Sequence, residues 1–124
     1  MLGYVTIGTK DLDKALAFYD AVLKPLGGER KFPMPEGRGH FYAGNGHGMV
    51  AVCRPYDGNE ATSGNGTMVA LDCPDHDTVK AVYDAAIAAG ATGDGEPGER
   101  IPGVFYGAYF HDPDGNKLCA YKMG

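Results

Sequence analysis

The sequence predicts an α+β fold made of two copies of a βαβββ module, because its pattern of elements repeats. Residues 18–21 (FYDA) and 82–85 (VYDA) lie 64 positions apart, and the same offset carries residues 4–7 (YVTI) onto residues 68–71 (MVAL). A duplicated unit of about 60 residues indicates two modules that share a core. We therefore expect two paired modules forming a curved mixed sheet around a trough, with the helices on the outer face.

The first module reads as a strand, a helix and three further strands. Residues 2–9 alternate in polarity, and Asp11 is the expected N-cap of a helix whose apolar positions recur at helical spacing. Pro25 and the two glycines that follow it end this helix. The remaining strands are expected at residues 29–32, 40–43 and 49–54, the last two as a hairpin.

The second module repeats this order. A helix begins at Asp75 or Asp77, runs to Ala89 and stops at Gly90. Strands are expected at residues 67–73, 91–92, 104–111 and 116–122, with a mobile loop at residues 94–103. The expected boundaries are residues 1–57 for module one, 58–63 for a polar linker and 64–124 for module two.

Bulk composition indicates an ordinary globular domain, with 44% apolar and 22% charged residues in a chain of 124. The formal net charge of −5 argues against nucleic acid as a partner. No apolar run approaches the roughly 18 residues of a membrane span, and the N-terminal residues do not resemble a secretory signal. The three cysteines lack Cys-x-x-Cys spacing. We expect a cytoplasmic protein with free thiols and no membrane partner.

Two motifs carry a family resemblance. Residues 4–19 follow the pattern Tyr-Val-Thr-Ile-Gly-x-x-Asp-Leu-x-x-Ala-x-x-Phe-Tyr, and residues 112–117 read Asp-Pro-Asp-Gly-Asn-Lys. With the duplicated element order, they resemble the vicinal oxygen chelate superfamily of glyoxalase I, bleomycin-resistance proteins and extradiol dioxygenases. Pro97-Gly98 and Arg100, ahead of two tyrosines, resemble its small bacterial glyoxalase-like branch. The resemblance implies the fold above and a homodimer, but this fold hosts several unrelated chemistries.

The resemblance also implies positions for a divalent metal. The superfamily's enzymes hold it with His, Glu or Gln from the first and last strands of each module. These positions fall on Tyr4, Met68, Cys119 and, when the two hairpin turns are aligned at their glycines, Val50. Hard or borderline divalent ions prefer oxygen or imidazole ligands. We therefore expect no metal and no other cofactor, with a Cu(I) site or a nucleophilic Cys119 as alternatives.

Aromatic and basic residues that should border the trough complete a candidate ligand site. Arg38 and Arg100 lie in equivalent loops, where they are suited to clamp a carboxylate. His40 and His47 flank one hairpin turn, across which they could face each other, and they are candidates because their strands should border the trough. The alternative for each is a solvated surface side chain. The full set of candidates is Tyr4, Arg38, His40, Tyr42, His47, Val50, Met68, Arg100, Tyr106, Tyr109 and Cys119.

The favoured function is metal-independent binding of a small organic molecule in the trough between the modules. The first alternative is a glyoxalase- or lyase-type enzyme that uses a metal at shifted positions or acid–base groups such as Tyr4 and His47. The second is a dimeric interaction module whose trough is filled by side chains.

Overall fold

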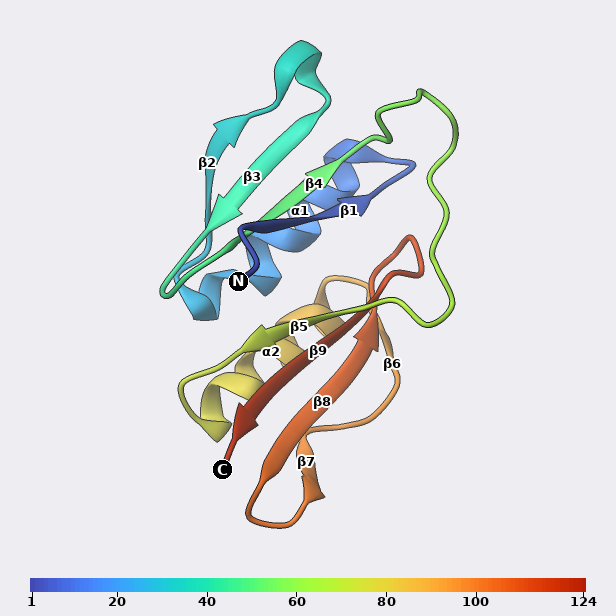
Figure 1. Cartoon of the computed structure of the whole chain (residues 1–124). Coiled ribbons are helices and arrows are strands. Elements are labelled where there is room, and N and C mark those ends of the chain that lie inside the picture. The colour runs from blue at the N-terminus through green and yellow to red at the C-terminus, as the bar shows by residue number, and fades with distance from the viewer.

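The computed structural model describes residues 1–124 and consists of two modules of the same element order (Figure 1). The first contains β1 (Tyr4–Gly8), α1 (Leu12–Val22), β2 (Glu29–Pro33), β3 (Gly39–Ala43) and β4 (Met49–Cys53), with short 3₁₀ turns η1 (Lys24–Leu26) and η2 (Pro35–Gly37). The second contains β5 (Met68–Asp72), α2 (His76–Ala88), β6 (Thr92–Gly93), β7 (Gly98–Ile101), β8 (Phe105–His111) and β9 (Lys117–Met123).

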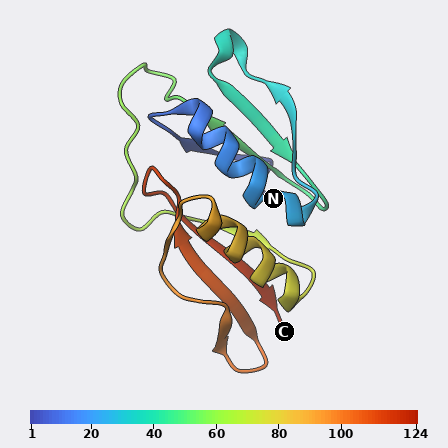
Figure 2. The same ribbon diagram turned by 180° about the vertical axis from the view of Figure 1, so that it is seen from behind.

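Each module forms its own mixed sheet, and the two sheets have the same strand order. The first runs β1-β4-β3-β2, and the second runs β5-β9-β8-β6 with β7 also paired to β8. β1 is parallel to β4 as β5 is to β9, and the hairpin strands are antiparallel. Both helices cover the same side (Figure 2), which leaves a helix-free face on the other. The predicted α+β fold is confirmed, with the strands divided between two sheets.

Both helices begin at the aspartates that local chemistry favours. The carboxylate of Asp11 accepts from the Lys14 amide at 3.2 Å, and that of Asp75 accepts from the Thr78 amide at 2.7 Å. Each bond satisfies an amide that has no partner within the helix. Asp75 is therefore the cap of α2, and Asp77 lies within its first turn.

One predicted loop is wrong in part. Residues 94–103 contain β7, which is antiparallel to β8 and pairs Gly98 with Gly107 and Glu99 with Tyr106. β6 and β7 together occupy the place on β8 that β2 occupies on β3. The segment contains several glycines and prolines, which more often mark turns, and its sequence therefore predicts a loop rather than a strand.

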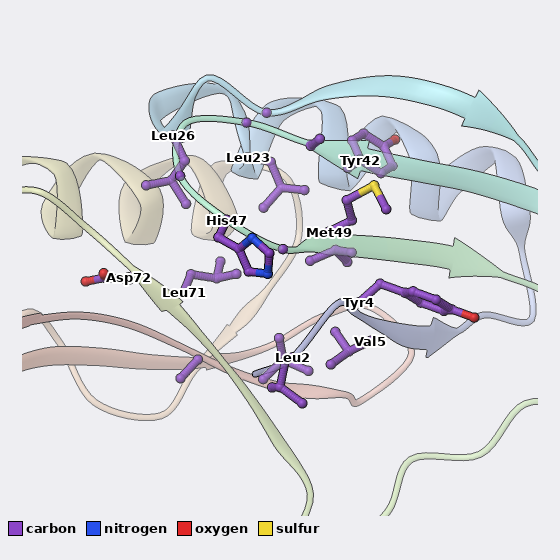
Figure 3. Close-up of a pocket in the computed structure, with 18 of the residues that line it drawn as sticks. Leu2, Tyr4, Val5, Leu23, Leu26, Tyr42, His47, Met49, Leu71 and Asp72 are labelled. Carbon is purple, nitrogen blue, oxygen red and sulfur yellow. The ribbon is translucent and has the colours of Figure 1, made fainter.

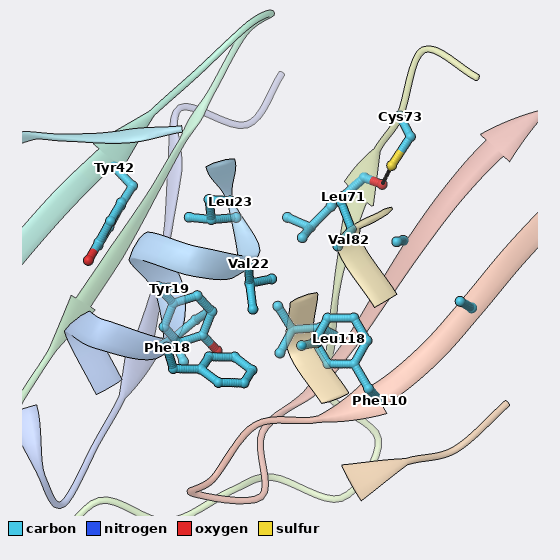
Figure 4. Close-up of a cluster of buried hydrophobic side chains, with 14 of the residues drawn as sticks. Phe18, Tyr19, Val22, Leu23, Tyr42, Leu71, Cys73, Val82, Phe110 and Leu118 are labelled. Atoms are coloured by element: carbon cyan, nitrogen blue, oxygen red, sulfur yellow. Dashed lines mark hydrogen bonds between the residues drawn. The ribbon is translucent and has the colours of Figure 1, made fainter. Parts of the chain in front are cut away.

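The core lies between the helices and the sheets and is shared by both modules (Figure 4). Strand alternation sends Ile7, Leu71, Leu118 and Ala120 into it, as the period of two predicts. From α1, Tyr19 is fully buried against the same cluster. Because one cluster spans both modules, neither sheet buries its apolar face alone.

No helix of the protein is both long and apolar enough to cross a membrane.

Candidate functional site

The two β-hairpins are equivalent, which identifies matching positions in the two modules. Tyr42 pairs with Val50 in the first hairpin, and Phe110 pairs with Leu118 in the second. The offset between the hairpins is therefore 68 residues, although β1 and β5 differ by 64. It places residues 44–48 (GNGHG, the Gly44 turn) on residues 112–116 (DPDGN, the Asp112 turn).

This equivalence corrects the position assigned to Val50. Aligning Gly46 with Gly115 is wrong by one residue, since Gly46 matches Asp114 and the partner of Cys119 is Ala51. A one-residue slip moves a side chain to the opposite face of a sheet. Val50 accordingly packs against the helix-side core, whereas Ala51 lies in a small cluster on the helix-free face.

The Asp112 turn joins the two modules through side-chain hydrogen bonds. The carboxylate of Asp112, 4% exposed, accepts from the Tyr19 hydroxyl of α1 at 2.6 Å and from the Asn116 amide at 2.8 Å. Asn116 Nδ2 donates to the Gly8 carbonyl at 3.0 Å, and Asp114 accepts from the Lys10 amide at 2.9 Å. This end of the junction is therefore closed by polar contacts.

The Gly44 turn lies at the other end of the junction between the modules (Figure 1). It has glycine at the positions of Asp112, Asp114 and Asn116, so only Asn45 and His47 carry side chains. A cavity of about 350 Å³ lies between this turn, β1 and β5. At the Gly44 turn the two modules are thus separated by a cavity, whereas at the equivalent Asp112 turn they are joined by hydrogen bonds.

The cavity is mainly apolar. Figure 3 shows Leu23 and Leu26 from the segment after α1, Leu71 from β5 and Val5 from β1 around the same space. Its polar groups come from residues such as Asn45, His47 and Asp72, and no Lys or Arg lines it. Such a lining is typical of small-molecule sites, which combine apolar walls with few polar anchors.

Five of the predicted site residues line this cavity. They are Tyr4, Tyr42, His47, Val50 and Met68. Tyr4 is 55% exposed, and its ring lies edge-on to Phe41 with centroids 5.1 Å apart. The hydroxyl of Tyr42 donates to the Leu16 carbonyl at 3.0 Å and to Asp20 at 2.7 Å. Burial, then the bond to Asp20, raises the pKa of Tyr42, so it acts as a neutral anchor of α1.

One histidine and one tyrosine do not lie where they were predicted. His40 pairs with Val52 at the far end of β3 from the Gly44 turn, so it cannot face His47 across that turn. His40 Nδ1 is buried without a hydrogen-bond partner. Tyr106 belongs to the helix-side core and stacks on His76 with centroids 3.9 Å apart. These positions follow from strand parity, since His40 and Tyr42 share the helix-facing side of β3.

Three other candidates gather on the helix-free face of module two. Tyr109 pairs directly with the fully buried Cys119. Over the Tyr109 ring lie the guanidinium of Arg100 at 5.5 Å and the ammonium of Lys117 at 5.4 Å. Burial raises the pKa of the Cys119 thiol. A neutral, covered thiol is a poor nucleophile, so this cluster gives no support to Cys119 as a catalytic group.

Arg38 belongs to a separate cluster. Its guanidinium donates to the Arg54 carbonyl at 3.1 Å and lies 3.8 Å from the Cys53 sulfur. It also lies over the Tyr56 ring at 5.4 Å. Arg38 and Arg100 thus contact different neighbours, Tyr56 and Tyr109, and they share no contact that supports the symmetric clamp expected of them.

The divalent metal implied by the family resemblance does not fit this chain. After the correction above, its four positions hold Tyr4, Ala51, Met68 and Cys119. Ala51 has no donor atom, Met68 offers a thioether, and the Cys119 thiol is kept protonated by burial. The structure contains no group of three or more His, Cys, Asp or Glu side chains placed to hold a metal ion. Oxygen or imidazole ligands are thus lacking at these positions.

Several cavity-lining residues were not among the candidates predicted from the sequence. Among the cavity-lining residues, Leu23, Leu26, Val69 and Leu71 have the pattern of ordinary core positions. Nothing in the sequence distinguishes a core side chain from one that borders a cavity. The difference between the two turns, glycine against aspartate and asparagine, indicates the cavity only after the strand register has aligned the two hairpins.

Comparisons with known proteins agree with this architecture. A family model described as Glyoxalase/Bleomycin resistance protein/Dioxygenase superfamily matches residues 1–120. A glyoxalase/bleomycin resistance protein from Albidiferax ferrireducens T118 is 34% identical, with a TM-score of 0.87 over 100% of this chain and 99% of that one.

Two more distant structures share the fold. A family enzyme from Burkholderia phytofirmans PsJN is 23% identical, with a TM-score of 0.76 over 98% of each chain. A lactoylglutathione lyase from Agrobacterium tumefaciens is 22% identical, with a TM-score of 0.70 over 98% of this chain and 92% of that one. No curated protein matches the chain. With the family model covering nearly its whole length, the chain belongs to the glyoxalase/bleomycin resistance protein/dioxygenase superfamily.

Proposed function

We propose that this protein binds a small organic molecule, without a metal, in the cavity beside the Gly44 turn. The observation that carries the proposal is the asymmetry of the two turns. At one end of the junction, side chains of the Asp112 turn make hydrogen bonds between the modules. At the other end, the glycines of the Gly44 turn border about 350 Å³ of mainly apolar space. The volume lies in the range of about 300–1,000 Å³ that is typical of ligand pockets.

The lining favours a ligand with an apolar body. Burying each CH₂ group of such a ligand contributes about 0.8 kcal/mol. Val5, Leu26 and Leu71 offer this apolar surface, and His47 supplies hydrogen-bonding capacity at the edge. Because no Lys or Arg lines the cavity, a carboxylate ligand would lose hydration without gaining a cationic partner. The ligand class is therefore a neutral or cationic molecule rather than an organic acid.

The alternative, a glyoxalase- or lyase-type enzyme, makes a different demand on the protein. Lewis-acid chemistry needs a bound metal, and the donors at the family positions do not supply a suitable ligand set. Binding without metal predicts that a chelator leaves the melting temperature unchanged. About one tightly bound Zn, Ni, Mn or Fe per chain, lost together with stability on chelation, would favour the enzyme.

We further propose that the protein is a homodimer, supported by exposed apolar side chains on the helix-free face. Phe32 pairs with Phe41 across β2 and β3, and Met123 pairs with Phe105 across β9 and β8. The side chains of Phe32 and Met123 are each more than half exposed. Each module thus has an exposed apolar pair on the same face of its sheet, and exposed apolar surface of this kind is available to a partner. Sedimentation equilibrium distinguishes a dimer from a monomer, and a monomer at high concentration would contradict this part of the proposal.

The ligand site is tested by filling the cavity. The Val50→Phe variant adds a ring to the cavity wall, whereas Val104→Phe makes the same change at an exposed position outside the lining. Wild-type protein and Val104→Phe should enhance the fluorescence of the neutral apolar probe N-phenyl-1-naphthylamine. Val50→Phe should lose at least about tenfold in affinity, equivalent to roughly 1.4 kcal/mol.

Circular dichroism must show that Val50→Phe remains folded, because overpacking can cost about 1–3 kcal/mol. Equal probe binding by folded Val50→Phe and wild type would sink the assignment. If Val50→Phe instead weakens probe binding as expected, native mass spectrometry of protein purified from its host would identify the natural ligand by its mass.

A further inference from the structure

Two arginines face each other across the end of the first hairpin. Beyond the last β3–β4 pair, Gly39 with Cys53, the chain continues into Arg38 on one side and Arg54 on the other. The Arg54 amide donates to the Arg38 carbonyl at 2.9 Å, which holds the two residues opposite each other. Like charges directly opposite in an antiparallel pair are destabilising. This arrangement therefore calls for a compensating charge.

Neither guanidinium has such a partner within the protein. The five ion pairs of the structure involve other residues, and the contacts of Arg38 and Arg54 are to neutral groups. Arg38 donates to the Arg54 carbonyl at 3.1 Å, and Arg54 donates to the Gly37 carbonyl at 3.0 Å. Each guanidinium has five N–H donors, so most of these remain free. The two groups are thus positioned but not neutralised.

The Arg54 contact depends on an unusual turn. Glu36 has a φ of 61° and Gly37 a φ of 66°, so two consecutive residues are left-handed. This conformation is uncommon for a residue other than glycine and often marks a site where geometry serves function. In η2 it leaves the Gly37 carbonyl within reach of Arg54.

Both guanidiniums border one hollow of about 590 Å³ with a mostly polar lining. Its charged residues are Lys10, Arg38, Arg54, Glu36 and Glu60, a net charge of +1 in a chain of net charge −5. Lys10 already pairs with Glu60 at 3.7 Å, which leaves two guanidiniums and Glu36. The hollow shares no residue with the cavity beside the Gly44 turn.

An aromatic ring completes the wall. Tyr56 is 89% exposed, and the Arg38 guanidinium lies over its ring at 5.4 Å. The ring restricts the guanidinium on one side through a cation–π contact and leaves the edge with its N–H groups available.

We propose that this hollow binds an oxyanion, the phosphate or carboxylate group of a small molecule, between the guanidiniums of Arg38 and Arg54. Guanidiniums bind both groups through paired N–H donors. Bound anion also relieves the repulsion between the two arginines. The site is independent of the proposed ligand cavity and adds a second, anion-selective function to the same module.

The site is tested by titrating ¹⁵N-labelled protein with inorganic phosphate or with succinate at constant ionic strength. Saturable shifts of the amides of Gly37, Arg38 and Arg54 are expected, with chloride alone producing none. Stronger response to phosphate identifies a phosphate group as the ligand, and stronger response to succinate identifies a carboxylate.

Matched variants separate a site from general attraction. Arg38→Gln and Arg54→Gln should each weaken binding at least about tenfold, since each removes hydrogen bonds to a charged group. Arg54→Lys should bind the anion more weakly than the wild type. The lysine ammonium keeps the charge but lacks the planar pair of N–H donors of a guanidinium. Arg100→Gln is the control: it removes the same charge from an arginine that also lies over a tyrosine, Tyr109.

Two outcomes would overturn the proposal. One is a set of shifts scattered over surface Lys and Arg residues, with Arg100→Gln as harmful as Arg54→Gln, which means an adventitious ion only. The other is saturable binding that neither Arg38→Gln nor Arg54→Gln weakens in protein with a wild-type circular dichroism spectrum. Val50→Phe should leave phosphate binding unchanged, so failure at one site does not imply failure at the other.

Discussion

The two hairpin turns have the same place in their modules and opposite effects on the junction between them. The Asp112 turn supplies side chains that reach Gly8, Lys10 and Tyr19 of the other module. The Gly44 turn, with glycine at the matching positions, borders a cavity instead. The difference shows that a duplicated backbone fixes where the turns lie, whereas their side chains decide whether each end is closed or open.

The helices show the same asymmetry. Tyr19 of α1 and Tyr83 of α2 occupy matching positions, and both rings are at least partly buried. The Tyr19 hydroxyl donates to Asp112 at 2.6 Å, whereas Tyr83 packs edge-on against Phe110 with centroids 6.4 Å apart. Both modules have a packed tyrosine ring at this position, and only the Tyr19 hydroxyl makes a bond across the junction.

The largest expected effect comes from Asp112→Ala. Asp112 accepts from Tyr19, from the amides of Asp114 and Asn116, and from Asn116 Nδ2, and it is almost fully buried. Its loss leaves several buried donors without an acceptor, so the free energy of unfolding should fall by about 3 kcal/mol. Urea unfolding followed by circular dichroism measures the change. A loss below about 1 kcal/mol would mean that the turn does not stabilise the junction.

Tyr19→Phe and Tyr83→Phe form a matched pair with a smaller effect. Tyr19→Phe should cost about 1–2 kcal/mol because it removes a bond to a carboxylate. Tyr83→Phe should change stability by less than about 0.5 kcal/mol, since its hydroxyl makes no hydrogen bond within the protein. Equal losses in the two variants would remove the asymmetry between the helices.

Tyr19→Phe should also change how the stability of the protein depends on pH in the alkaline range. Burial, followed by the charge of Asp112, raises the pKa of Tyr19 well above 10.0. Above pH 10 the unfolded chain loses this proton while the folded protein keeps it, so stability falls as pH rises. Each such group contributes at most about 1.4 kcal/mol per pH unit. Tyr19→Phe should therefore flatten the decline of stability above pH 10, and identical slopes for variant and wild type would contradict this.

Asp114→Ala should have the smallest effect among the variants that remove a hydrogen bond across the junction. Its carboxylate accepts one bond across the junction, from the Lys10 amide at 2.9 Å in an exposed position. Water replaces the lost acceptor there, so the expected cost is about 0.5 kcal/mol. A loss as large as that of Asp112→Ala would place the main stabilisation in the exposed contact rather than in the buried one.

Much of the fold was predictable because it depends on local patterns. Asp11 and Asp75 cap the helices as expected, and Ile7, Leu71 and Leu118 face the helices as alternation requires. Val50 was misplaced because one residue of misalignment reverses strand parity. The prediction for His40 is wrong because the side-chain period of β3, and not proximity to the turn, decides which face His40 occupies.

The sequence by itself determined the duplication, the element order and the lack of His, Glu or Gln at the family positions Tyr4, Met68 and Cys119. These follow from local periodicity and from residue chemistry. Tertiary structure alone decided that the Gly44 turn meets β5 across a cavity and that Arg38 faces Arg54 without an ion-pair partner. The physical reason is that a cavity, or an uncompensated charge, depends on what lies opposite a residue in space, and sequence distance does not encode that.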